Sequence, residues 1–466
     1  MRAVLFPGNK EVRVGDDRCR ACGGAAWISR PLLLVALCLA AILGLATGAT
    51  AQDAAVGAWA ASPQPPYESG ISHDGFNDQT VRNIVHLSAG GSELCVRLSN
   101  EFGEKPLEIG AASVAVREAG AATVAGTNQA LTFDGSASVG IPAGEEVYSD
   151  PVAFETAPGQ SLAVSVYVPQ ETGPVTWHQL GQQVNYISNR GNHAADAEAA
   201  AYSGGQTSYF FLTGVDVFGA AEQGTIVAVG DSITDGYGST LDANGRYPNY
   251  LAQRVLDAGV GKSVVNAGIS GNRILNDSPA YGIKLLDRFD RDVLSQSGVT
   301  DVILLEGIND IGHSQSGDDP SVQPNPDVSA DQIIEGMREV IDLAHAEGLR
   351  VHGATILPFE GADYFYEAGE EKRQAVNDFI RNSGEFDGVV DFDAALRDPA
   401  NPRRLLPAYD SGDHLHPNDA GYRAMAEAVD LALLSRQAAA QMPDTGGPSP
   451  LVPVAAALLM GLGALG

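Results

Sequence analysis

Hydrophobic and polar positions follow two different rhythms along the chain. From residue 52 to residue 218 they alternate in short runs separated by Gly and Pro, and within residues 92–99 Leu94, Val96 and Leu98 share one side. Alternation with a period of two is typical of strands that bury one face. Regularly spaced short strands of this kind predict an antiparallel β-sandwich for residues 52–218.

From residue 225 onward, apolar runs of strand length alternate with stretches of helix length. Strands are predicted at residues 225–229, 263–267, 301–305, 350–356 and 388–393. The clearest helix is predicted for residues 330–347, where apolar residues recur every three or four positions and Ser329 can form a capping box with Gln332. This alternation predicts an α/β domain over residues 225–436, a doubly wound parallel sheet with helices on both faces.

The amino-terminal segment has the pattern of an export signal. An apolar run at residues 32–45 precedes Ala49-Thr50-Ala51, the small-residue pattern that a signal peptidase needs. We therefore expect cleavage before Gln52 and secretion of the protein. The leader of residues 1–51 is long, which favours a misassigned start, and a retained membrane anchor stays open as the alternative.

Residues 437–466 are predicted to be a linker with an apolar tail. In this segment Met442-Pro-Asp-Thr-Gly446 resembles the Leu-Pro-x-Thr-Gly signal by which sortases attach exported proteins to the cell wall of Gram-positive bacteria. Met442 departs from the Leu of that signal, and no basic residue follows the apolar stretch. The resemblance implies covalent attachment to the cell wall or cell surface, and a simple membrane anchor remains the alternative.

The charge balance narrows the range of partners. The chain of 466 residues has 28 basic and 58 acidic residues, a formal net charge of −30. Such an excess of carboxylates repels phosphate backbones and anionic lipid surfaces, so we expect neither nucleic acid nor an anionic membrane as a partner. The apolar content of 44% is typical of a globular protein, and the length calls for at least two domains.

One serine stands where parallel α/β sheets bind their ligands. The strand predicted at residues 225–229 runs directly into Gly230-Asp231-Ser232. Because ligands bind at the carboxyl ends of parallel strands, Ser232 is a candidate nucleophile. The alternative is that Ser232 only caps the next helix.

A nucleophilic serine needs a base, a group that orients the base, and donors for the oxyanion. Asp413 precedes His416 by three residues, so its carboxylate can accept from the Nδ1–H of His416 and leave Nε2 free for Ser232. Gly271 follows the second strand of the α/β domain and Asn309 follows the third. Neighbouring parallel strands would therefore bring a backbone N–H and an amide to the edge that carries the serine.

Other interpretations of these residues stay open. His414 and His416 with Asp413 could hold a metal, although no third cluster with ligand spacing accompanies them. Gly271 and Asn309 could be ordinary turn residues. Three carboxylates could act in a glycosidase, although bonding to backbone groups in their own loops is the favoured role. These are Asp231, Asp235 and Asp310.

Four short blocks in this order resemble the SGNH, or GDSL, hydrolase superfamily. They are Gly230-Asp231-Ser232, Asn266-Ala-Gly-Ile-Ser-Gly271-Asn272, Gly307-Ile-Asn309-Asp310 and Asp413-His-Leu-His416-Pro417. The resemblance implies that Ser232 is the nucleophile, His416 the base and Asp413 its orienting partner. It implies an oxyanion hole made by the N–H of Ser232, by Gly271 and by Asn309, with Asp231 and Asp310 supporting the loops and no metal or organic cofactor.

The order of the two domains extends the resemblance. A β-domain ahead of such a hydrolase is similar to a two-domain branch of esterases associated with xylan degradation, and to carbohydrate acetylesterases with a jelly-roll domain. The resemblance implies a secreted serine esterase that removes O-acetyl groups from polysaccharide. The alternatives are a short-chain aryl esterase or lipase, and a cell-surface carbohydrate-binding protein with a vestigial hydrolase domain.

Overall fold

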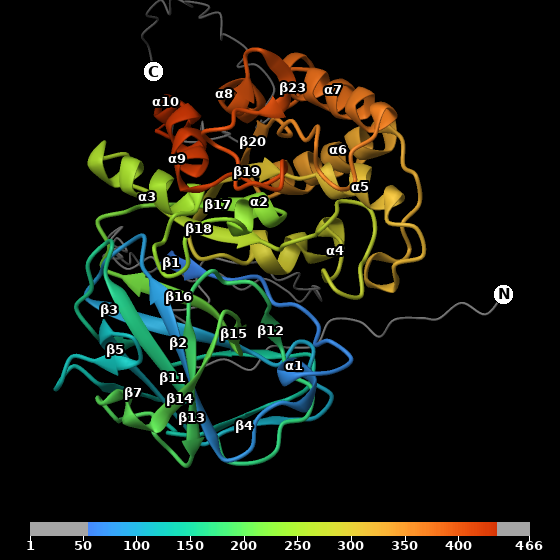
Figure 1. Cartoon of the computed structure of the whole chain (residues 1–466). Helices are drawn as coiled ribbons and strands as arrows, with labels where there is room; N and C mark the ends of the chain where they lie inside the picture. Colours follow the sequence, from blue (N-terminus) through green and yellow to red (C-terminus); the bar gives the residue numbers. More distant parts are fainter. Residues whose placement is uncertain (1–54, 436–466) are drawn as a thin grey trace, which may run out of the picture.

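The computed structural model describes residues 55–435, which form a β-rich domain followed by an α/β domain (Figure 1). β16 (Leu212–Phe218) is the last strand of the first domain, and β17 (Thr225–Gly230) is the first strand of the second. The predicted leader and the wall signal at Met442–Gly446 lie outside the described residues. Within residues 55–435, no helix is long and apolar enough to span a membrane.

The β-rich domain is built from two antiparallel sheets that share one apolar core. The first sheet has the order β1 (Val56–Ala60), β16, β3 (Glu93–Ser99) and β10 (Val152–Ala153), with β9 (Glu146–Tyr148) also on β3. The second has the order β14 (Tyr202–Gln206), β13 (Asn185–Arg190), β2 (Gln79–His86), β11 (Ser161–Val168), β5 (Ala111–Ala119) and β6 (Ala122–Thr123), with β7 (Gln129–Leu131) also on β5. The predicted antiparallel β architecture is confirmed, and its jelly-roll-like character stays a prediction.

Smaller elements complete the β-rich domain. They are α1 (Ile71–Asp74), the pair β4 (Leu107–Ile109) and β8 (Val139–Ile141), and the pair β12 (Trp177–His178) and β15 (Tyr209–Phe210). Trp177 is buried in the core, where its ring stacks on Phe210. Trp177 is therefore a packing residue of this domain.

The α/β domain is a five-stranded parallel sheet with helices on both faces. Its order is β18 (Ser263–Gly268), β17, β19 (Val299–Leu305), β20 (Arg350–Ala354) and β21 (Gly388–Val390). One face packs on α4 (Leu285–Phe289), α6 (Ala330–Ala346) and α7 (Glu367–Asn382), and the other on α3 (Tyr247–Asp257), α8 (Phe392–Leu396), α9 (Asp419–Ala428) and α10 (Leu431–Leu434). The predicted doubly wound sheet is confirmed.

Side-chain caps set the ends of two predicted elements. The capping box of α6 is confirmed, because Ser329 Oγ accepts from the Gln332 N–H at 3.2 Å and Gln332 Oε1 accepts from the Ser329 N–H at 2.9 Å. The strand predicted for residues 388–393 ends instead at Val390. There the Asp391 side chain accepts from the Ala394 N–H and starts α8, so a cap overrides the apolar run.

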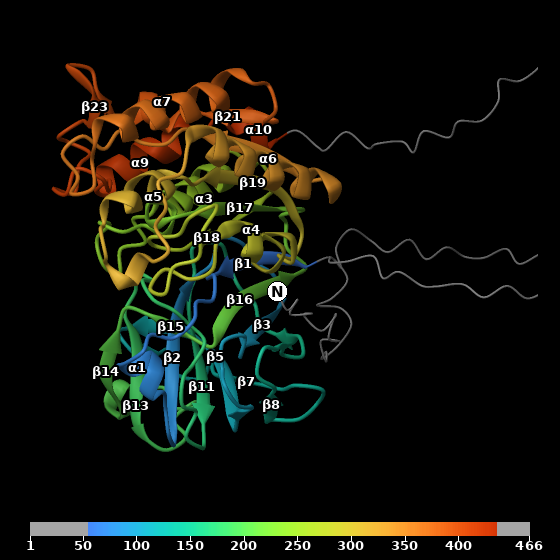
Figure 2. The same ribbon diagram turned by 90° about the vertical axis from the view of Figure 1, so that its right-hand side faces the viewer.

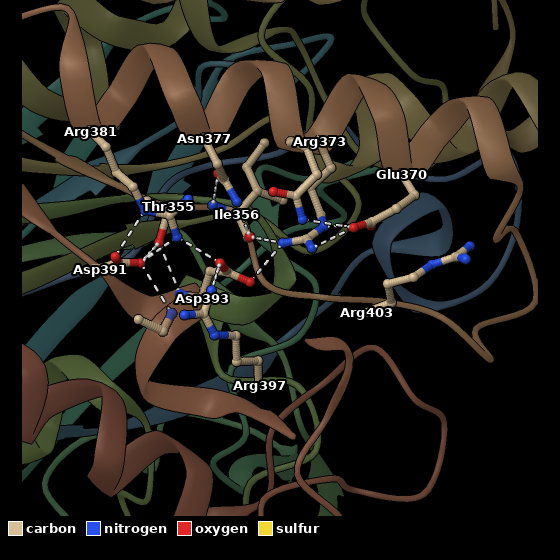
Figure 3. Close-up of polar contacts among 12 residues, drawn as sticks. Thr355, Ile356, Glu370, Arg373, Asn377, Arg381, Asp391, Asp393, Arg397 and Arg403 are labelled. Atoms are coloured by element: carbon tan, nitrogen blue, oxygen red, sulfur yellow. Dashed lines mark hydrogen bonds and ion pairs between the residues drawn. The ribbon is translucent and has the colours of Figure 1, made fainter. Parts of the chain in front are cut away.

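Charged side chains fasten α7 to the segment that follows β21 (Figure 3). Arg373 is fully buried, and its Nη1 lies 2.8 Å from Asp393 Oδ1 while its Nε lies 2.7 Å from Glu370 Oε2. Arg381 contacts both Asp391 and Asp393 at 2.6 Å. Each buried charge thus has a close partner, which is the condition for burying it at tolerable cost.

The two domains meet along β1 and β18, which lie side by side at their junction (Figure 2). Arg97 on β3 donates to Gln296 Oε1 at 2.9 Å, and Ser297 Oγ donates to Asp216 Oδ2 at 2.8 Å. The second face of the β1–β16–β3 sheet is therefore covered by the α/β domain, and the polar residues on it are buried.

Candidate active site

Ser232 begins a short helix at the carboxyl end of β17. The strand ends at Gly230, where a Cβ would lie 2.1 Å from the Leu305 carbonyl oxygen. Asp231 then caps α2 (Ser232–Asp235), because its Oδ1 accepts from the Ile233 N–H at 2.9 Å. The interpretation of Ser232 as the helix cap is therefore wrong, since Asp231 occupies that position and leaves the hydroxyl of Ser232 for other partners.

Ser232, His416 and Asp413 form one hydrogen-bonded chain. Ser232 Oγ lies 2.8 Å from His416 Nε2, and His416 Nδ1 lies 2.7 Å from Asp413 Oδ2. An ionised carboxylate only accepts, so Nδ1 carries the proton and Nε2 can accept from the serine hydroxyl. The structure thus brings together the three residues predicted as nucleophile, base and orienting acid.

The orienting carboxylate is held ionised. Partial burial disfavours the charge of Asp413, but hydrogen bonds from the His416 side chain and backbone outweigh it and keep the pKa of Asp413 well below its usual range. Oδ1 of Asp413 accepts from the N–H groups of His416 and Leu415 at 2.8 and 3.0 Å. The tight loop before α9 therefore fixes both partners of the pair.

His414 points to a different partner from its neighbour. Its Nδ1 lies 2.6 Å from Asp410 Oδ2, within the same loop. In the part of the chain from residue 55 to residue 435, no group of three or more His, Cys, Asp or Glu side chains is placed to hold a metal. His414 and His416 thus have separate carboxylate partners.

The two other predicted oxyanion positions lie at the same edge of the sheet as Ser232. In the parallel register, Gly230 at the end of β17 is paired with Gly268 of β18 and with Leu305 of β19, so the segments that follow these strands emerge together. Gly271 has a φ of +77°, and a Cβ there would lie 2.3 Å from the Tyr281 ring, so no other residue fits.

The Asn309 amide is held by two neighbours. Its Nδ2 donates to the Asn272 carbonyl at 3.0 Å, and its Oδ1 accepts from the Tyr364 hydroxyl at 3.3 Å. An amide has a second N–H, which is the group that an oxyanion would use. That Gly271 and Asn309 form an oxyanion hole stays a prediction.

His313 belongs to this region, although no sequence motif singled it out. Its Nε2 lies 3.2 Å from the Gly271 carbonyl, and its ring is stacked on Tyr281 at 5.6 Å between centroids. Burial lowers the pKa of His313 to about 4, so the ring is neutral and Nε2–H donates to Gly271. The sequence signal that could have identified His313 is its position one helical turn after Asn309, at the same edge of the parallel sheet.

The predicted supporting carboxylates are buried and bonded to backbone N–H groups. Asp310 accepts from the N–H groups of Ile274 and Leu275 at 2.8 and 3.1 Å, so it also fastens the loop after β18. Burial raises the pKa of Asp310 to about 6 and that of Asp231 to about 7. These contacts give both residues a structural role in the loops of the site.

Glu306, at the end of β19, makes the stability of the fold pH-dependent. Its carboxyl is fully buried 4.0 Å from Arg288 Nη2, and burial together with Asp231 raises its pKa well above the usual value. A carboxyl with a raised folded-state pKa stabilises the fold at low pH, and this contribution is lost as pH rises from the unfolded value near 4 toward the folded one.

We therefore expect Glu306→Gln to melt roughly 2–4 °C above the native protein at about pH 8, with a smaller difference at about pH 5. Thermal melts at the two pH values measure this. Glu339→Gln, on the exposed face of α6, is the matched control and should show no such pH dependence. A Glu306→Gln variant that gains nothing at the higher pH would refute the explanation.

A comparison with protein families identifies a match over residues 228–424, to the GDSL-like Lipase/Acylhydrolase family. The match covers less than half of the chain, and it contains Ser232, Gly271, Asn309, Asp413 and His416. It supports a hydrolase of the GDSL/SGNH superfamily, as the four sequence blocks predict. A comparison with curated proteins found no match.

Solved structures similar to the chain include three hydrolases. One is a variant of an acetyl xylan esterase from Geobacillus stearothermophilus, with 23% identity, 46% of this chain and 95% of that chain covered, and a TM-score of 0.35. A carbohydrate acetylesterase family member from Sinorhizobium meliloti has 17% identity and a TM-score of 0.36, and the match covers 46% of this chain and 100% of that chain. A GDSL-like lipase from Bacteroides thetaiotaomicron has 19% identity and a TM-score of 0.34, and the match covers 45% of this chain and 88% of that chain. These distant likenesses carry no conclusion about substrate.

Proposed function

We propose that this protein is a secreted serine esterase that removes O-acetyl groups from polysaccharide through an acyl-enzyme intermediate. One observation carries the proposal: Ser232, His416 and Asp413 are joined at 2.8 and 2.7 Å, in the protonation order that nucleophilic catalysis needs. Export, attachment through Met442–Gly446 and kinship with two-domain esterases of xylan degradation remain predictions from the sequence. The proposal gives no role to a metal or an organic cofactor.

The first half of the reaction makes the acyl-enzyme. Ser232 Oγ bonds to the ester carbonyl carbon while its proton passes to His416 Nε2, and Asp413 stabilises the imidazolium that forms. The N–H groups of Ser232 and Gly271 and the Asn309 amide would hold the oxyanion. His416 then gives the proton to the alcohol oxygen as the ester C–O bond breaks, and the alcohol leaves.

The second half releases the acid and restores the serine. Water attacks the acyl carbonyl, His416 takes a proton from that water, and the same oxyanion donors stabilise the second tetrahedral intermediate. The bond from Ser232 Oγ to the acyl carbon breaks as His416 returns the proton to Oγ.

Acetate release from acetylated xylan tests the substrate class. We expect the native protein to release acetate and Ser232→Ala to release none above background, because the variant has no nucleophile. If neither does so while the native protein cleaves p-nitrophenyl acetate, the protein is an aryl esterase or lipase. If neither ester is cleaved, the rival interpretation stands, a carbohydrate-binding protein with a vestigial hydrolase domain.

An exposed aromatic ring beside the base favours a carbohydrate alcohol. Tyr237 is 43% exposed, and its ring centroid lies 4.4 Å from that of His416. Its backbone is fixed, since its N–H donates to the Ser232 carbonyl at 2.9 Å and its carbonyl accepts from the Tyr422 hydroxyl at 2.5 Å. Because His416 protonates the leaving alcohol, that alcohol must lie beside this ring, where a sugar could stack.

We expect Tyr237→Ala to raise KM for acetylated xylan by roughly tenfold, which corresponds to about 1.4 kcal/mol of binding energy. The same variant should change kcat/KM for ethyl acetate little, because that alcohol has no ring to stack. Tyr237→Phe should behave like the native protein, and Leu241→Ala, another exposed residue of the same loop, is the control. Equal losses on both substrates would count against a sugar platform.

A further inference from the structure

A histidine of the β-rich domain reaches the helix that carries Ser232. His178, on β12, is 5% exposed, and its Nε2 lies 3.1 Å from Asp235 Oδ1. Asp235 is the last residue of α2, the four-residue helix that begins at Ser232. The helix of the nucleophile is therefore bonded across the domain boundary.

The same carboxylate also holds the loop of the predicted oxyanion hole. Asp235 Oδ2 accepts from the Ser270 N–H at 3.0 Å and from Ser270 Oγ at 2.6 Å. Ser270 directly precedes Gly271, whose N–H is a proposed oxyanion donor. Asp235 thus connects the nucleophile helix, the oxyanion loop and His178.

The partners of His178 define its protonation state. Nδ1 lies 2.9 Å from the Ser62 carbonyl, which can only accept, and Nε2 faces a carboxylate. Both ring nitrogens must therefore donate, so His178 is an imidazolium paired with Asp235. Burial opposes this charge, but the attraction and hydrogen bond of Asp235 outweigh burial and raise the pKa of His178.

Two further groups face this imidazole. The positive charge of Arg246 disfavours the positive charge of His178, and the Arg246 guanidinium donates to the Gly181 carbonyl. The Tyr209 ring lies 6.1 Å away, and burial raises its pKa to about 12, so it stays neutral. A cavity of about 60 Å³ between the domains also borders His178 and Asp235, without including Ser232 or His416.

We propose that His178 is a positioning residue for ester hydrolysis: by holding Asp235, it fixes the Ser232 helix relative to the Ser270–Gly271 loop. The inference rests on the proposed function and adds to it a task for the β-rich domain. A four-residue helix has too few internal hydrogen bonds to hold its own direction. Without the imidazolium, the carboxylate loses one of its three donors, and a small displacement of nucleophile against oxyanion donors lowers the rate steeply.

The test replaces His178 in the full chain and measures kcat and KM for p-nitrophenyl acetate. We expect His178→Phe, which keeps a ring but no donor, to lower kcat by about 10- to 100-fold with little change in KM. His178→Gln keeps one donor for Asp235 and should lose less. A packing role alone would make the Phe variant the milder of the two.

The pH profile gives a second readout that packing would not change. In the native protein, kcat should decline as pH rises through the raised pKa of His178, because deprotonation removes one of its two donors. His178→Gln should lack this alkaline decline, since an amide does not titrate. An unchanged alkaline decline in the Gln variant would overturn the proposal.

Ser297→Ala is the matched control. It removes the interdomain hydrogen bond to Asp216, and Ser297 lies just before β19, at the edge of the sheet opposite to the one that carries Ser232. We expect it to lower the melting temperature without changing kcat. A loss of kcat equal to that of His178→Phe would show that any interdomain bond matters, and would overturn the specific role of His178.

The remaining outcomes separate a failure of the His178 inference from a failure of the proposed function. A folded His178→Phe variant with native kcat overturns the inference while leaving the proposed function intact. If His178→Phe fails to fold, His178→Gln and Ser270→Ala test the same role, because each alters one partner of the Asp235 carboxylate. A native kcat in both variants would overturn the inference. If Ser232→Ala keeps native activity on the same ester, the proposed function itself fails.

Discussion

Ser232→Ala is expected to lower kcat for p-nitrophenyl acetate by about 10³- to 10⁶-fold and to leave the melting temperature close to that of the native protein. The hydroxyl is 2.8 Å from the base, and the helix behind it is capped by Asp231, so the substitution removes the nucleophile without removing the cap. Steady-state kinetics with a thermal melt measure both effects.

A double variant sharpens this expectation. Ser232 and His416 act as one unit, so Ser232→Ala combined with His416→Ala should cost about as much as either change alone. Additive losses would show that the two residues act independently. Near-native rates in a folded Ser232→Ala variant would overturn the assignment of the nucleophile, whatever the double variant does.

Asp413→Asn is expected to lower kcat by about 10⁴-fold with little change in the fold. The amide of Asn can donate to Nδ1 of His416, which moves the imidazole proton to Nε2 and removes the acceptor that Ser232 needs. Because Oδ1 of Asn can still accept from the N–H groups of His416 and Leu415, the loop should keep its shape. The effect should therefore appear in kcat and not in the melting temperature.

The same loop offers a matched control for this variant. Asp410 holds His414 at 2.6 Å as Asp413 holds His416 at 2.7 Å, but only the second pair reaches Ser232. Asp410→Asn should therefore keep kcat within a few-fold of the native protein. An equal loss in both variants would mean that loop integrity, and not the tautomer of His416, explains the result.

Local patterns were sufficient for the parallel sheet and for most of the candidate site. Runs of buried residues identified β17, β18 and β19, and parallel pairing places their carboxyl ends at one edge for any sequence that forms such a sheet. Ser232, Gly271 and Asn309 could therefore be assigned to one region from their positions after these strands. Asp413 and His416 could be paired because their contact spans only three residues.

The structure differs from the sequence interpretation where a carboxylate binds a backbone group that the sequence pattern did not indicate. The strand predicted to reach residue 393 stops at Val390 because Asp391 caps a helix, and Asp310 bonds the loop after β18 in addition to its own. The sequence around a carboxylate does not show which backbone N–H groups it will accept from, because that depends on how the loops pack in the folded protein.

The sequence by itself determined the two kinds of domain, their order, and which strand ends present the candidate catalytic groups, because these follow from residue periodicity and short-range contacts. Only the tertiary structure decided that Arg97 and its neighbours on β3 are buried at a domain interface, and that His178 meets Asp235 from the other domain. Such contacts depend on how two separately formed surfaces fit together, and no local pattern in the chain encodes that fit.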